Sequence, residues 1–146
     1  MRICLIPKVH GVGGMVSFQA KLTAGLTARG IQVSDDPSGP DCDAVLITGG
    51  TRDIPGLLRL RRRGVRIIQR LDGINWLHRR MYTGPRHFLR AEYGNHLLAL
   101  LRARVVTHIV YQSDFVHAWW GRQFGPERVP SVVIHNGVDL SVYTPT

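Results

Sequence analysis

An α/β fold with a parallel sheet of about six strands is predicted by three features of the sequence. Short β-branched apolar runs alternate with longer stretches of helical periodicity, the pattern of consecutive βαβ units. Gly30 and Gly64 stand where two of these helices should end. A glycine-rich stretch at residues 11–14 separates the first apolar run from the first helix. The length of 146 residues suits one domain with its own core.

Each element follows from its local pattern. The predicted strands are residues 3–6, 31–34, 44–47, 65–68, 105–111 and 132–134. The predicted helices lie around residues 16–28, 57–60, 85–101 and 115–119. Segment 35–41 is rich in turn-forming residues and is predicted to be a surface loop. Helices between successive parallel strands cover both faces of a sheet, so we expect a Rossmann-like, doubly wound single domain over residues 1–135.

The basic composition is the strongest compositional signal. The chain carries a formal net charge of +9, which attracts phosphates, nucleic acid or an anionic membrane face. The densest run of arginines is Arg59, Arg61, Arg62, Arg63 and Arg66. This run also fits the solvated C-terminal end of a helix, where cations are favoured. Charge alone does not choose among these partners.

The two cysteines, Cys4 and Cys42, show neither a CxxC motif nor the Cys/His spacing of a zinc site. We expect both to be small buried residues in a reducing compartment, and therefore a cytoplasmic protein. The seven histidines likewise lack the spacing of metal ligands, so no metal is expected. Of the neighbouring Trp119 and Trp120, one is expected to pack inward.

The glycine-rich loop is the first candidate site. Gly13 and Gly14 follow the first strand and open a helix, whose free N–H groups favour an anion. In an open parallel sheet this loop lies at the carboxyl edge, where ligands bind. The dinucleotide motif GxGxxG is not met, because Val16 occupies the place of the third glycine. The alternative is a tight turn without a ligand.

The second candidate site is segment 69–75, which we expect directly after the fourth strand. Arg70, Asp72 and Asn75 would then lie at the carboxyl edge of the sheet. The alternative interpretations are a structural Arg70–Asp72 ion pair and an Asp72 cap on a short helix near Trp76. We expect Gly13, Gly14 and Asp72 to face one common cleft.

Taken in order, these motifs resemble a known family. They are Gly13-Gly14-Met15, Arg70-Leu71-Asp72-Gly73, Tyr111-Gln112-Ser113-Asp114-Phe115, Ile134-His135-Asn136-Gly137-Val138-Asp139-Leu140 and Tyr143-Thr144-Pro145. This series is similar to the GT-B-fold retaining glycosyltransferases, the group that includes phosphatidylinositol mannosyltransferases and glycogen synthases. The likeness covers the whole chain but only the N-terminal, acceptor-side half of such an enzyme. Residues 136–146 would begin the linker to a donor-binding domain that this sequence lacks.

The resemblance implies roles for individual residues. Gly13 and Gly14 would approach the donor diphosphate, and Asp72 would be catalytic, although many members have a histidine at its position. Arg70 and Asn75 would line the same cleft, and Asn136 would lie on its hinge side. The nucleotide-sugar donor would be a substrate, with no further cofactor. The isolated half would be inactive.

The resemblance also implies partners. They are the donor-binding domain, in the same or a separate chain, and a glycan or lipid-linked acceptor. An anionic membrane surface and self-association through the uncovered cleft are further expectations, so the protein would be cytoplasmic and peripheral at the inner membrane face. The alternative function is a stand-alone basic Rossmann-like module that binds nucleic acid or another polyanion. No RRM, KH, zinc-finger or helix-turn-helix signature accompanies that alternative.

Overall fold

A computed structural model describes residues 1–39 and 41–137 of the chain. Its strands are β1 (Arg2–Ile6), β2 (Gln32–Ser34), β3 (Ala44–Ile47), β4 (Arg66–Leu71), β5 (His108–Tyr111) and β6 (Ser131–Val133). Its α-helices are α1 (Gly14–Thr27), α2 (Ile54–Arg62), α3 (Pro85–Leu100) and α4 (Asp114–Phe124). A short 3-10 helix, η1 (Leu77–Arg79), precedes α3, and a π-helical turn, η2 (Leu101–Val105), extends it.

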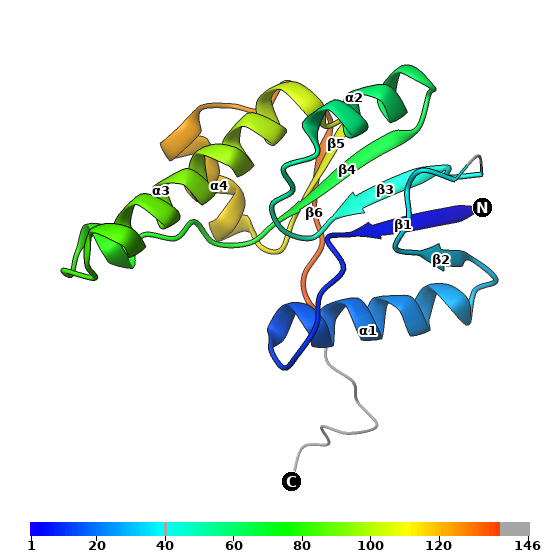
Figure 1. The fold of residues 1–146 in the computed structure, drawn as a ribbon, viewed down its shortest axis with the longest axis horizontal. Helices are drawn as coiled ribbons and strands as arrows, with labels where there is room; N and C mark the ends of the chain where they lie inside the picture. The colour runs from blue at the N-terminus through cyan, green and yellow to red at the C-terminus, as the bar shows by residue number, and fades with distance from the viewer. Residues whose placement is uncertain (40, 138–146) are drawn as a thin grey trace, which may run out of the picture.

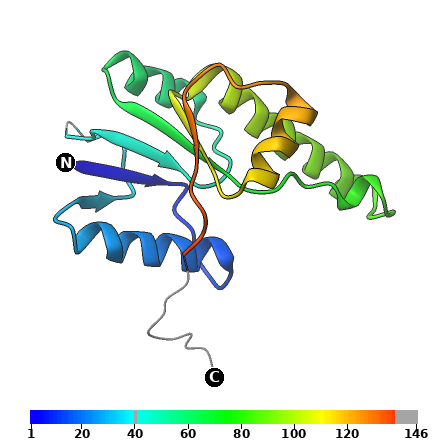
Figure 2. The same cartoon turned by 180° about the vertical axis from the view of Figure 1, so that it is seen from behind.

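The six strands form one sheet in the order β2-β1-β3-β4-β5-β6, and every neighbouring pair is parallel. Helix α1 covers one face of the sheet, and α2, α3 and α4 cover the other (Figures 1 and 2). The predicted α/β fold, a Rossmann-like sheet of six parallel strands, is therefore confirmed. Because β1 connects to β2 on one side while β3 lies on its other side, the strand order reverses at β1, where open sheets hold ligands.

The hydrophobic core lies almost entirely between the sheet and the layer of α2–α4. Alternate residues of the central strands point into this layer, among them Val45, Ile47, Ile67, Leu71 and Ile109. They pack against buried helix residues that include Leu57, Leu101, Val116 and Trp120. Burying one such aliphatic side chain contributes about 1.5–3 kcal/mol. In contrast, α1 has no buried residue, so its face of the sheet is only partly covered.

The predicted strand at residues 105–111 is wrong in its first half. Leu101–Val105 continue α3 as a π-helical turn, and the strand begins only at His108. The apolar run is real, but Val105 and Val106 are buried as the end of a helix rather than as strand residues. Arg102 reinforces the turn from inside, because its guanidinium donates to the Tyr111 hydroxyl at 3.0 Å and to Glu127 at 3.1 Å. Hydrophobic periodicity gives no sign of this buried arginine.

Two glycines end helices as predicted. Gly30 and Gly64 adopt positive φ values of 73° and 86° after α1 and α2.

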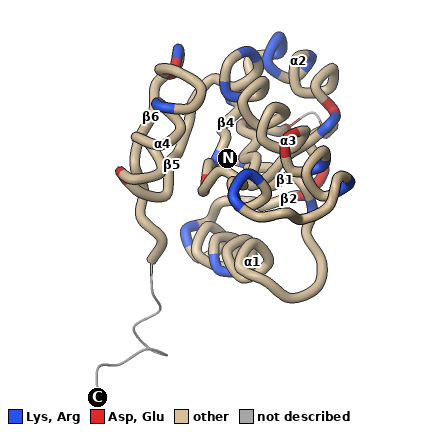
Figure 3. Tube along the Cα trace, turned by 90° about the vertical axis from the view of Figure 1, so that its left-hand side faces the viewer, with Lys and Arg blue, Asp and Glu red and all other residues tan. Residues whose placement is uncertain are grey.

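The arginine run falls in the last turn of α2 and just after it, and Arg61 donates to the backbone carbonyls of Arg104 and Val105. Lys and Arg positions are spread over the surface (Figure 3). Within residues 1–39 and 41–137, the structure contains no helix that could span a lipid bilayer.

Candidate ligand-binding cleft

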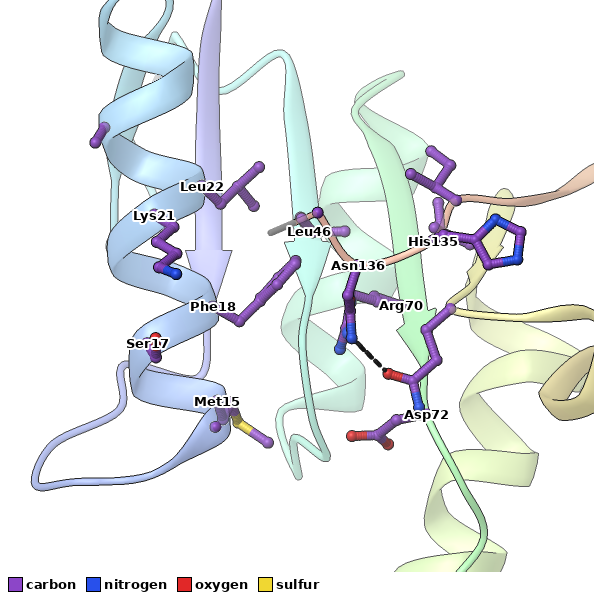
Figure 4. Close-up of a pocket in the computed structure, with 16 residues that line it drawn as sticks. Met15, Ser17, Phe18, Lys21, Leu22, Leu46, Arg70, Asp72, His135 and Asn136 are labelled. Atoms are coloured by element: carbon purple, nitrogen blue, oxygen red, sulfur yellow. Dashed lines mark hydrogen bonds between the residues drawn. The ribbon is translucent and has the colours of Figure 1, made fainter. Parts of the chain in front are cut away.

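A cleft of about 850 Å³ opens on the α1 face of the sheet. One wall is α1, and the floor consists of residues from β3, β4 and β5 (Figure 4). The opposite wall is the chain that follows β6, at residues 134–137. Apolar side chains form much of the floor and the α1 wall, among them Phe18, Leu22, Leu46 and Val110. Polar groups gather where the cleft reaches the carboxyl ends of the strands.

The N-terminus of α1 presents backbone donors to this cleft. Ser17 N–H donates to the carbonyl of Gly13 at 3.0 Å, so the N–H groups of the preceding residues lack that helical bond. Gly13 is the N-cap, with no side chain to occupy these donors, and the first turn has no acidic residue. Gly14 and Met15 line the cleft. A free helix N-terminus of this kind favours phosphate or carboxylate groups.

Gly13 has a φ of 156° and a ψ of 170°, a conformation that residues with a Cβ rarely adopt. A Cβ built on either Gly13 or Gly14 would meet no atom within 4 Å. Nothing in the protein itself therefore excludes a side chain at Gly14, whose φ is not positive. The space beside it is open to a ligand.

Arg70 joins three walls of the cleft. Its guanidinium lies 4.0 Å from the ring centroid of Phe18 on α1. It donates to Oε1 of Gln112, just after β5, at 3.1 Å and to Oδ1 of Asn136 at 2.9 Å. Asn136 Nδ2 in turn donates to Gln112 Oε1 at 3.2 Å (Figure 4). This closed triangle fixes the chain after β6 against the sheet.

Asp72 follows β4 directly, and its side chain lines the same cleft. In the part of the chain that the structure describes, its carboxylate accepts no hydrogen bond and forms no ion pair within 4.0 Å. It is not a helix cap, and it forms no direct ion pair with Arg70. Burial lowers the pKa of the Arg70 guanidinium, and the negative charge of Asp72 opposes part of that change.

The structure brings together most of the residues that the sequence indicated. Gly14, Arg70, Asp72 and Asn136 line one cleft, and Gly13 caps the helix at its mouth. Arg70 lies within β4 rather than after it, because the strand extends to Leu71. For the same reason Gln69 is wholly buried on the opposite face, where its Nε2 donates to the Leu98 carbonyl at 3.2 Å.

Asn75 does not line this cleft. Its backbone N–H donates to Asn95 Oδ1 at 3.1 Å, and its carbonyl accepts from Asn95 Nδ2 at 2.7 Å. These two bonds hold the chain after β4 against α3, on the opposite side of the sheet. The position of Asn75 depends on Asn95, a buried residue twenty positions later. No local sequence motif predicts that these two residues pair.

Gln112 and Phe18 also line the cleft, and no sequence pattern assigned either of them a role. Gln112 follows β5 as Asp72 follows β4, so its position at a strand end was the available signal. Phe18 lies on α1 one turn after Gly14, and its contact with Arg70 has no counterpart in the sequence pattern. The remaining residues of the predicted linker, 138–146, lie outside the described part of the chain.

The cleft thus combines backbone donors for an anion, an unpaired carboxylate and a partly apolar floor. Among the residues described, no group of three or more His, Cys, Asp or Glu side chains is placed to hold a metal ion. No protein-family model, curated protein or solved structure matches the chain.

Proposed function

We propose that this chain is the N-terminal, acceptor-side domain of a two-domain retaining glycosyltransferase. It would act with a donor-binding domain to move a sugar from a nucleotide sugar to an acceptor hydroxyl. The observation that carries the proposal is the shared cleft of Asp72 and the α1 N-terminus. An unpaired carboxylate and free backbone N–H groups lie at one edge of the sheet. A reacting nucleotide sugar needs both, because its sugar becomes positively charged while its diphosphate is negatively charged.

Sugar transfer builds positive charge on the anomeric carbon and negative charge on the departing diphosphate. The N–H groups at Gly14 and Met15 suit the diphosphate oxygens, because they are already oriented and need no reorganisation. The Asp72 carboxylate suits the sugar side, where it would accept a hydrogen bond from a hydroxyl and stabilise the developing positive charge. We therefore propose Asp72 as the catalytic residue, with Gly13 and Gly14 at the diphosphate.

In this proposal Arg70 and Asn136 fix one wall of the cleft and do not contact the donor. Both groups already bond to Gln112 and to each other. Their bonds place the chain after β6 beside the cleft mouth, where the donor-binding domain would follow. Catalysis by positioning needs such a fixed wall, because small displacements of reacting groups lower the rate steeply.

The cleft is open on one side, so a bound donor would remain largely solvated in this chain alone. Few contacts would then offset the lost freedom of the ligand. We expect the isolated chain to fold but not to catalyse transfer. No metal or additional cofactor enters the proposal, and the acceptor would be a glycan or a lipid-linked sugar.

A transfer assay tests the function directly. The 146-residue chain, alone and joined to a donor-binding domain, would be incubated with radiolabelled nucleotide sugars and candidate acceptors. We expect transfer only by the joined enzyme, and loss of that transfer when Asp72 is replaced by Asn. Transfer by the isolated chain, or full activity of the Asp72→Asn enzyme, would contradict the proposal.

A salt titration of DNA binding separates the nucleic-acid alternative from the proposed function. A module held by phosphate contacts loses affinity steeply as salt rises. Sequence-independent binding of the isolated chain to DNA, with unchanged strength after Asp72→Asn, would favour the alternative and leave the cleft without a role.

A further inference from the structure

A second surface of the molecule exposes apolar side chains that the cleft does not use. It comprises Trp76, η1, the loop after η1 and the first turns of α3. Six large apolar residues there are exposed: Trp76, Leu77, Met81, Tyr82, Phe88 and Leu89. Tyr82 is 92% exposed and Leu89 68%. We call this surface the α3 patch.

The α3 patch lies away from the cleft. Helix α3 covers the face of the sheet opposite α1, and its N-terminal end projects beyond the sheet together with η1 (Figure 1). Exposed aliphatic and aromatic side chains gathered on a projecting segment mark an interaction surface, because single exposed apolar residues are usually scattered. The fold does not need these side chains in its core.

Arginines are interspersed with the apolar residues along this segment. Arg80, Arg86 and Arg90 are exposed and form no hydrogen bond or ion pair with any described residue. The nearest acidic residue of the segment, Glu92, is already engaged: Arg79 donates to its two oxygens at 2.5 and 2.9 Å. Three positive charges of the segment are therefore left without a partner in the described structure.

The segment is held firmly enough to present these side chains as a unit. His78 is buried, with its Nε2 2.6 Å from Glu92 Oε1 on α3. Its ring packs edge-on against Phe88, with 5.1 Å between ring centroids. These contacts fix η1 on α3, while the apolar side chains of the patch stay exposed.

We propose that the α3 patch docks the protein on an anionic membrane surface. Tryptophan and tyrosine favour the boundary between headgroups and acyl chains, and aliphatic side chains enter it beside them. Unpaired arginines nearby attract anionic headgroups. Nucleic acid would match the arginines and the aromatic rings, but it offers nothing to Leu77, Met81 and Leu89. An anionic membrane surface therefore accounts for both the unpaired arginines and the exposed apolar side chains.

Vesicle sedimentation tests this proposal on the 146-residue chain. Binding would be measured to phosphatidylcholine vesicles with and without phosphatidylglycerol. We expect binding only where the anionic lipid is present. The variant R80Q/R86Q/R90Q should lose about 100-fold in affinity for anionic vesicles, at about 1 kcal/mol for each charge removed. The control R62Q/R66Q/R128Q removes three exposed positive charges elsewhere on the chain and should lose much less.

An apolar variant separates docking from simple charge attraction. M81S/Y82S/L89S keeps every charge and changes only exposed side chains, so it should fold normally and still lose most vesicle binding. Trp76 supplies a spectroscopic signal, because its indole should enter the lipid boundary. Its fluorescence should shift to the blue with anionic vesicles, and the shift should vanish in Trp76→Phe while Trp119 and Trp120 remain.

Equal losses in the two arginine variants would overturn the proposal, because net charge alone would then explain binding. Unchanged vesicle binding by M81S/Y82S/L89S would also overturn it. Tight binding of a single-stranded oligonucleotide that R80Q/R86Q/R90Q abolishes, without vesicle binding, would assign the patch to nucleic acid instead. Each measurement is independent of glycosyl transfer, so failure of the cleft proposal leaves this test unaffected.

Discussion

The indole Nε1 of Trp120 donates a 2.8 Å hydrogen bond to the backbone carbonyl of Asp72. Trp120 belongs to α4 and is fully buried in the helical layer opposite the cleft. The bond therefore fixes the backbone at the tip of β4 from behind, while the side chain of Asp72 faces the cleft. A core residue positions the proposed catalytic group.

Replacing Trp120 with Phe should test that positioning. The ring is largely retained, but the donor is lost, so we expect about 1 kcal/mol less stability from the hydrogen bond, plus a packing loss of similar size. Chemical denaturation measures this cost. Trp119→Phe is the matched control, because Trp119 is only partly buried and its indole forms no hydrogen bond with described residues. Equal destabilisation of both variants would contradict a specific role for the Trp120 bond.

Replacing Asp72 with Asn should barely change the free energy of unfolding. Its carboxylate has no hydrogen bond or ion pair to lose within residues 1–39 and 41–137. In the joined two-domain enzyme the same change should lower kcat by about 100-fold or more, as expected for a group that stabilises transition-state charge. Melting temperature and turnover are measured on the same samples. Asp114→Asn, on the exposed first turn of α4, is the control. Parallel losses of stability and turnover in Asp72→Asn would argue for a structural role.

Replacing Gly14 with Ala should separate stability from binding. The position is helical and a Cβ there meets nothing within 4 Å, so the variant should be more stable by about 0.5–1 kcal/mol. If a diphosphate approaches the backbone there, the same methyl group should weaken its binding. Thermal melting and calorimetric titration of the joined enzyme with nucleotide sugars measure the two effects. Gly25→Ala, later in α1, should leave binding unchanged. Undiminished binding by Gly14→Ala would exclude close backbone approach.

The contact between η1 and α3 should weaken in acid. The Arg79 guanidinium, and then the His78 imidazole, lower the pKa of Glu92 from its ordinary value of 4.5 to about 2. A carboxyl whose pKa is lower in the folded state stabilises the fold above pH 4.5, and this contribution is lost as the pH falls toward 2. Melting temperature measured across this range should fall less steeply in Glu92→Gln than in the natural protein. Identical curves would show that the contact contributes nothing.

The sequence predicted the sheet because each strand has its own local signal: a short apolar run closed by a glycine or a turn. It also predicted that Asp72 and Gly14 would face one cleft, since the carboxyl ends of parallel strands share an edge. The neighbours that hold these residues were not predictable in the same way. Gln112 and Trp120 reach Arg70 and Asp72 through contacts between residues about 40–50 positions apart.

The predictions from the sequence pattern were wrong where polar residues pair in the interior. At residues 105–107 the predicted secondary structure was wrong, and for Asn75 the predicted side of the sheet was wrong. The π-helical turn depends on buried Arg102, whose partners lie up to 25 residues later in the chain. Asn75 was expected in the cleft from its position after β4, but its partner Asn95 holds it against α3. Hydrophobic periodicity describes which face of an element is buried, and it does not describe which polar groups find each other there.

The uneven coverage of the sheet has a consequence for local unfolding. Because α1 contributes no fully buried side chain, detaching it exposes little apolar surface, whereas detaching α4 would expose Trp120. The free energy of opening should therefore be smallest for α1, and its amide hydrogens should exchange with solvent well before those of β3, β4 and β5. A ligand held between α1 and the sheet would then slow exchange in that one helix, reporting occupancy of the cleft without any assay of catalysis.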